Sequence, residues 1–139
     1  MKAVRLFIDT NVILDLALDR TEFVKDAESL FSLKDQEKID IYISSLTLST
    51  VAYFADKQKL DSFSVVRKFL NWVNVIDLEN IFFKQVLESD FLDFEDGLQY
   101  FSAARIIGIQ AIITRNEKDF KHSKIPVISP QNFLAQFKL

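Results

Sequence analysis

The 139-residue chain contains no cysteine, which excludes disulfide bridges and zinc sites built on thiolates. This composition fits a reducing compartment, and we expect a cytoplasmic protein. The chain has only two glycines and two prolines, which indicates short loops. We find no linker, repeat or low-complexity segment, so we expect one domain over residues 1–139. The single histidine, His122, lies in a polar loop and offers little basis for histidine chemistry.

Long hydrophobic runs are also absent. No apolar stretch has the length of a membrane span, and the first apolar run is broken at Asp9, so we expect neither a membrane segment nor a signal peptide. The net charge of −3 argues against a broad basic surface for nucleic acid. An acidic site with a local basic rim remains compatible with that charge. Fourteen phenylalanines indicate an aromatic-rich core.

Apolar runs and segments of helical spacing alternate along the chain. We expect strands over 4–8, 39–44, 72–77, 110–114 and 126–128, with helices between and after them. This alternation predicts an α/β fold with a mostly parallel sheet of about five strands and helices on both faces, a three-layer α/β/α arrangement. The longest helix is expected over 93–107, with Gly108 as its left-handed C-terminal cap.

The first strand is followed at once by a carboxylate, Asp9, and then by Thr10 and Asn11. Ligands of open parallel sheets bind beyond the carboxyl ends of the strands, which is where Asp9 is expected. A simpler interpretation is that Asp9 or Thr10 only caps the next helix, since both residue types are good N-caps.

A second acidic cluster, Asp93, Glu95 and Asp96, opens the longest expected helix. Carboxylates are favoured there by the helix dipole alone, and Asp93 with Asp96 resembles a capping box. However, this helix is apolar on more than one side, so its start should pack against the sheet. We expect Asp96, next to Gly97, to face the sheet edge.

A third polar segment, 114–124, follows the fourth expected strand. It begins at Thr114 and offers oxygen ligands in Asn116, Glu117 and Asp119, and most such runs are simply solvated loops. Carboxylates that meet at one sheet edge would suit Mg²⁺ or Mn²⁺, which polarises a phosphoryl oxygen and lowers the pKa of water. The cations in the same segment would then hold phosphates: Arg115, Lys118 and Lys121.

Three blocks together resemble the PIN domain family, the nuclease fold of VapC-type toxins: IDTNVILDLAL at 8–18, DFEDGLQYFSAA at 93–104 and ITRNEKDF at 113–120. They stand in the family's order and spacing over essentially the whole chain. The length and second block resemble a bacterial subgroup of predicted nucleic-acid-binding PIN proteins. The resemblance implies a metal-dependent ribonuclease that acts on RNA, with an antitoxin as partner in the toxin–antitoxin pairs. PIN domains often form dimers, and the aromatic-rich helices would permit a homodimer.

The resemblance also implies site residues. Asp9 and Asp96 would be the main metal ligands, Asp119 the final acidic position and Asn11 a polar neighbour. The supporting positions would be Thr114, Asn116, which stands where many relatives have aspartate, and Glu95 and Asp93, which could compensate for a missing acid. The missing acid is the glutamate that the family carries after the second strand. Thr50, or Ser49 by a shifted alignment, stands in its place.

Three hypotheses follow. The first is an endoribonuclease in which Asp9, Asp96 and Asp119 hold Mg²⁺ or Mn²⁺. The second, supported by Thr50, is a catalytically weak or inactive PIN fold that binds nucleic acid or a partner. The third is an aspartate-based phosphatase or receiver domain, and it is poor. The phosphatases need a second aspartate where Asn11 stands, and receivers need an acidic pair before Asp9, where the chain has Phe7 and Ile8.

Overall fold

The computed structural model describes residues 3–137. Strand β1 (Val4–Ile8) leads into helix α1 (Thr10–Ala17), and strands and helices then alternate to the end of the described chain. The other strands are β2 (Ile39–Ser44), β3 (Asn74–Ile76), β4 (Ala111–Ile113) and β5 (Val127–Ile128). The other helices are α2 (Val24–Asp35), α3 (Ser45–Lys57), α4 (Ser62–Trp72), α5 (Asn80–Leu87), α6 (Phe94–Ala104), the 3-10 turn η1 (Glu117–Phe120) and α7 (Pro130–Gln136).

The strands form one sheet in the order β3-β2-β1-β4-β5, and every pair of neighbours is parallel. β1 is central: Phe7 lies opposite Tyr42 of β2 on one side and Ile112 of β4 on the other. The expected α/β fold with about five mostly parallel strands is therefore confirmed. Because all strands run the same way, their carboxyl ends share one edge, and the turns after β1 and β4 meet there.

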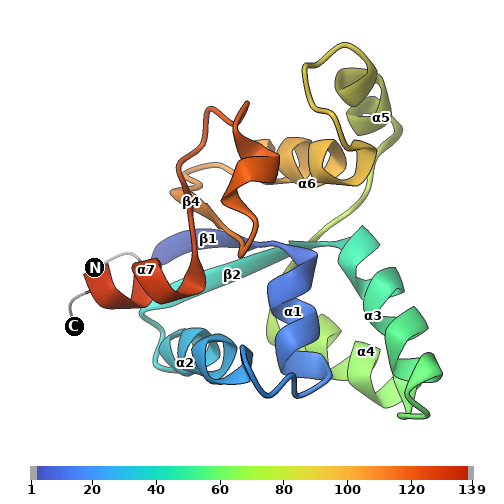
Figure 1. Ribbon diagram of the computed structural model, residues 1–139, viewed down its shortest axis with the longest axis vertical. Helices are drawn as coiled ribbons and strands as arrows, with labels where there is room; N and C mark the ends of the chain where they lie inside the picture. Colours follow the sequence, from blue (N-terminus) through green and yellow to red (C-terminus); the bar gives the residue numbers. More distant parts are fainter. Residues whose placement is uncertain (1–2, 138–139) are drawn as a thin grey trace.

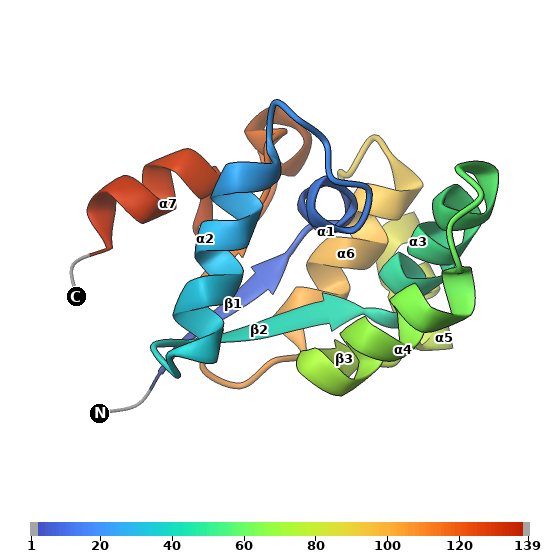
Figure 2. The same ribbon diagram turned by 90° about the horizontal axis from the view of Figure 1, so that it is seen from below.

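Helices cover both faces of the sheet, as Figures 1 and 2 show. On one face Leu6 and Ile8 of β1 pack with apolar side chains of α1, α2, α3 and α4. On the other face Phe7 packs with Tyr100 and Ala103 of α6. Leu6, Phe7 and Ile8 are all fully buried, because a parallel strand covered on both sides needs apolar residues at every position. β1 thus provides a rigid base for the residue that follows it.

The prediction of the longest helix was wrong in its extent. α6 ends at Ala104, and α3, with 13 residues, is longer than α6, with 11. After Ala104 the chain tightens through hydrogen bonds from Arg105 N to Ser102 O and from Ile106 N to Ala103 O. Gly108 does adopt the left-handed conformation, with φ of 75°, but in the turn beyond the helix. Within residues 3–137 we find no helix with the length and apolar character needed to cross a membrane.

Candidate active site

Asp9 lies directly after β1 and is also the N-cap of α1. Its Oδ1 accepts a hydrogen bond from Thr10 N at 2.9 Å, and its own N–H donates to Ile113 O of β4 at 2.9 Å. The residue is only 5% exposed. The two interpretations drawn from the sequence are therefore compatible: Asp9 caps α1, and it also lies at the carboxyl edge of the sheet.

Thr114, at the end of β4, is fully buried and holds the other carboxylate oxygen of Asp9. Its hydroxyl donates to Asp9 Oδ2 at 2.7 Å and accepts from Asn116 N at 3.0 Å. This chain of bonds fixes the Asp9 carboxylate and couples it to the start of the segment that carries Asp119. Thr114 and Asn116 are thus brought to the site, Asn116 through its backbone.

The second carboxylate, Asp96, lies in the first turn of α6 and is half-buried. Asp93 caps this helix by accepting a hydrogen bond from Asp96 N at 2.9 Å. Asp93 and Glu95 are exposed, as is Asp119 on η1. The expected capping pair is confirmed, and α6 presents its acidic end at the sheet edge where β1 and β4 end.

The pKa values of Asp9 and Asp96 show that these acids interact. Burial raises the pKa of Asp9, against the hydrogen bonds from Thr114 and Thr10, and the charges of Glu95 and Asp119 raise it further. Burial, followed by the charges of Asp93, Asp9, Asp119 and Glu95, raises the pKa of Asp96 to about 7. Carboxylates from three separate segments therefore repel one another across one edge of the sheet.

This donor set fits a hard divalent cation, because such a cation prefers carboxylate oxygens and would relieve the repulsion. Within residues 3–137, no three acidic or histidine side chains are grouped closely enough to form a ready three-ligand metal site. Mg²⁺ does not need one, since it keeps several waters and is usually bound through one or two protein carboxylates. Asp9 and Asp96 are the two that carry raised pKa values.

A buried polar network, which the sequence did not reveal, ties three helices together behind the acids. The Thr10 and Thr47 hydroxyls lie 2.7 Å apart, and Gln99 Nε2 donates to both of them. All three residues are buried, and among the described residues Gln99 Oε1 has no hydrogen-bond partner. The sequence offers one weak signal for this network: Gln99 is a polar residue three positions after Asp96, on the same side of the helix.

Thr50, the residue expected at the position of the family's glutamate, lies on α3 one turn after Thr47. Its hydroxyl donates to Leu46 O at 3.1 Å, within its own helix. Ser49, the alternative, is exposed on the same helix. Neither residue has a described side-chain hydrogen bond to Asp9 or Asp96, so α3 contributes no charge at this position.

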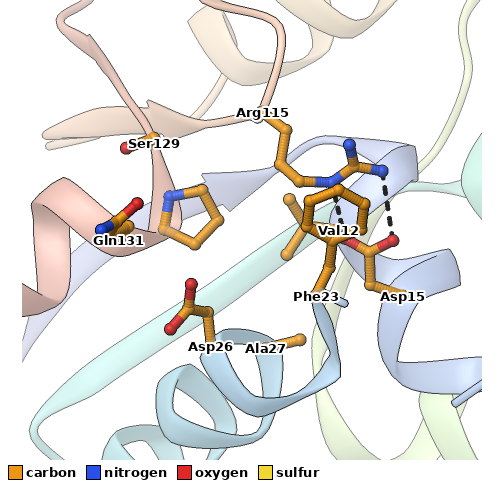
Figure 3. Close-up of a pocket in the computed structure, with 9 residues that line it drawn as sticks. Val12, Asp15, Phe23, Asp26, Ala27, Arg115, Ser129 and Gln131 are labelled. Atoms are coloured by element: carbon orange, nitrogen blue, oxygen red, sulfur yellow. Dashed lines mark hydrogen bonds and ion pairs between the residues drawn. The ribbon is translucent and has the colours of Figure 1, made fainter. Parts of the chain in front are cut away.

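Arg115 was expected to contact nucleic acid, but its guanidinium is engaged elsewhere. It donates to both carboxylate oxygens of Asp15 on α1, with Nε to Oδ2 at 2.8 Å and Nη2 to Oδ1 at 3.2 Å. It also stacks on the Phe23 ring, 3.8 Å from the centroid. Figure 3 shows these groups beside a cavity that Asp26 and Gln131 also line. Arg115 therefore fastens the 114–120 segment to α1, and Asp15 is a further residue that sequence reasoning missed.

The remaining predicted residues lie around the same edge. Asn11 is half-buried in the first turn of α1. Lys118 and Lys121 are exposed in and after η1, next to Asp119 in the chain. Both lysine side chains are therefore accessible to solvent near Asp119.

Comparisons with known proteins agree with this arrangement. The sequence profile of the PIN domain family matches residues 5–118. "Ribonuclease VapC1" of Aquifex aeolicus (strain VF5) is 27% identical, covering 99% of this chain and 98% of the relative.

Two solved structures share the fold. A toxin-antitoxin complex from Klebsiella pneumoniae contains a chain that superposes with a TM-score of 0.65 and 25% identity, covering 90% of this chain and 97% of that one. A chain of VapBC2 from Rickettsia felis, bound to a DNA fragment from their promoter, superposes with a TM-score of 0.61 and 18% identity, covering 91% and 98%.

Proposed function

The chain belongs to the PIN domain family, and from that premise we propose that it is a metal-dependent endoribonuclease that hydrolyses phosphodiester bonds of RNA. The observation that carries the proposal is the burial of Asp9 at the carboxyl edge of the sheet, where its charge and those of Asp119 and Glu95 contribute to the raised pKa of Asp96. The relative named ribonuclease supports the same activity.

In this proposal Asp9 and Asp96 hold Mg²⁺ or Mn²⁺, with Asp119 as a further acid. When bound, the ion supplies Lewis-acid polarisation of a phosphoryl oxygen and lowers the pKa of water. Thr114 and the Thr10 amide keep the Asp9 carboxylate in one orientation, which removes the need to order it during the reaction. Lys118 and Lys121 attract the RNA backbone without reading its sequence.

We propose further that the protein acts in the cytoplasm as the toxin of a toxin–antitoxin pair. The named relative and both structural neighbours carry VapC, VapBC or toxin-antitoxin names, and this chain covers nearly their full length. An antitoxin protein would then block the acidic edge until it is removed.

One observation favours a second candidate, a PIN fold that binds RNA or a partner but cuts weakly. Thr50 supplies no carboxylate from α3, and its hydroxyl is turned to Leu46 O. Cleavage and binding assays on the same RNA distinguish the two candidates, since the second retains affinity without metal-dependent cleavage.

Asp9→Asn tests the proposed function. The amide oxygen can still accept from Thr10 N, and the amide nitrogen can donate to the Thr114 hydroxyl, so the fold should persist, while the charge that binds metal is lost. We expect Mn²⁺-dependent cleavage of single-stranded RNA to fall by about a hundredfold, since even the loss of a residue that supports a metal ligand costs about 10- to 100-fold. Circular dichroism checks the fold, and Glu28→Gln, an exposed change on α2, is the matched control. Undiminished cleavage by Asp9→Asn would refute the site.

A further inference from the structure

A cavity of about 380 Å³ lies between α6 and the segment that follows η1. One wall is the 88–101 stretch, with Glu88, Asp90, Phe91 and Tyr100, and the other contains His122 and Lys124. The volume lies in the range typical of small-molecule pockets. No residue of this cavity takes part in the acidic site described above.

Both walls of the cavity belong to chain segments that also carry acids of the site described above. Tyr100 lies one turn after Asp96 on the same stripe of α6, and residues that far apart on a helix are neighbours. On the other wall, His122 follows Asp119 by three residues. Lys124 N donates a hydrogen bond to Tyr100 Oη at 3.4 Å, and this bond connects the two walls. A group in this cavity would therefore lie next to a substrate held at the acidic edge.

Aromatic rings dominate the inner part of the cavity. The Phe91 ring lies between the other two rings: its centroid is 5.1 Å from the centroid of the Tyr100 ring and 6.1 Å from that of the His122 ring. Phe91 is half-buried and His122 is exposed, so their ring faces and edges remain available to a ligand. Such platforms suit the flat faces of nucleobases, which stack on aromatic side chains in single-stranded nucleic acid.

The charges at the rim select which part of a nucleotide enters. Glu88 and Asp90 repel phosphate, but their carboxylates accept hydrogen bonds from amino groups on a base edge. Lys124, on the opposite wall, is placed to attract a phosphate outside the cavity. The lining thus favours a base that carries an exocyclic amino group over uracil, which has none.

We propose that this cavity is a nucleobase subsite that holds an unpaired, amino-bearing base of the RNA next to the scissile phosphate. The inference rests on the proposed function for the identity of the polymer, but base binding can be measured without cleavage. Such a subsite would select unpaired RNA, because the edge of a paired base is already hydrogen-bonded and its faces are covered by neighbouring bases.

The test is the affinity of a short fluorescein-labelled RNA for the full chain in EDTA, followed by anisotropy. The wild type is compared with Phe91→Leu and His122→Ala, and with Phe63→Leu, an exposed phenylalanine on α4 outside the cavity. We expect the first two variants to bind about tenfold more weakly and the control to bind as the wild type. When one cytosine of the RNA is replaced by an abasic unit, binding by the wild type should weaken by a similar factor. Uracil in place of that cytosine should weaken binding by the wild type less. Neither change to the RNA should weaken binding by Phe91→Leu further.

Cleavage of the same RNA in Mn²⁺ separates this inference from the proposed function. If the wild type cleaves and both cavity variants bind as well as the wild type, the subsite is refuted and the nuclease stands. If the wild type does not cleave but the variants lose affinity, the subsite stands and the nuclease falls. Should Phe91→Leu fail to fold, His122→Ala, at an exposed position, decides alone. If both cavity variants bind RNA as tightly as the wild type, the cavity does not bind a base, and a protein segment is the alternative occupant.

Discussion

Asp96 makes the stability of the metal-free protein depend on pH. Its pKa is raised from 3.8 to about 7, so the folded state binds a proton that the unfolded state has already lost between those values. The resulting stability is fully present below pH 4 and is lost as the pH rises through 7. We expect the melting temperature in EDTA to fall between pH 5 and pH 8, and Asp96→Asn to reduce that fall.

The matched comparison is again Glu28→Gln, which should show the wild-type pH dependence. Addition of Mn²⁺ at pH 8 should raise the melting temperature of the wild type more than that of Asp96→Asn, because a ligand that binds only the folded state stabilises it. Identical pH profiles for the wild type and Asp96→Asn would show that the acids do not interact as described.

Thr50 allows a gain-of-function experiment. If its place on α3 is the one where relatives carry an acid, Thr50→Glu adds a carboxylate to a cation site whose affinity depends on the number of charged ligands. We expect the Mn²⁺ concentration for half-maximal cleavage to fall by about tenfold. Thr50→Gln, of equal size but uncharged, should not lower it. Equal behaviour of the two variants would place Thr50 outside the metal site.

The parts of the site that could be predicted from the sequence are those formed by residues close together in the chain. Asp9 follows an apolar strand directly, and Asp93 stands in a capping position before Asp96, so both could be identified from local pattern. Arg115 could not be placed, because its partner Asp15 lies 100 residues away. The Thr10–Thr47–Gln99 network likewise joins three helices, and the spacing of Gln99 after Asp96 does not show which residues Gln99 contacts.

Helices α5 and α6 meet at Gly97, directly after Asp96. A Cβ at Gly97 would lie 2.8 Å from both γ-methyl groups of Val86, a stiff β-branched side chain. Gly97→Ala should therefore destabilise the protein by about 1–2 kcal/mol, even after its gain in helix propensity. Urea denaturation measures this change.

A second substitution separates packing from backbone effects. Val86→Ala removes the obstructing methyl groups, so the double variant should be more stable than the sum of the single effects by about 1 kcal/mol. Additive effects would show that the two helices are not in tight contact at Gly97.

The end of α6 shows why boundaries are harder to predict than elements. The apolar spacing continues to Ile107, yet the helix ends at Ala104. The guanidinium of Arg5 donates to the carbonyl oxygen of Ile107, and Arg5 N donates to the side chain of Gln110. These bonds join β1 to the turn before β4, and no local pattern around residue 104 contains them.

For the molecule as a whole, alternation of apolar strands and amphipathic helices was enough to predict the fold. Each expected strand exists, although three are shorter than expected: β3 at Asn74–Ile76, β4 at Ala111–Ile113 and β5 at Val127–Ile128. The strand order was not predictable from the pattern, because β1 pairs with both β2 and β4 through contacts between distant segments. That order is what brings the turn after β4 beside Asp9.

Asp9 and Asp96 lie 87 residues apart in the chain, and the proposed function requires them to bind one divalent cation together. Titration of the full chain with Mn²⁺, with free Mn²⁺ followed by electron paramagnetic resonance, tests it without reference to RNA. We predict binding by the wild type and by Glu28→Gln, and strongly weakened binding by both Asp9→Asn and Asp96→Asn. Wild-type Mn²⁺ affinity in either aspartate variant would contradict the account.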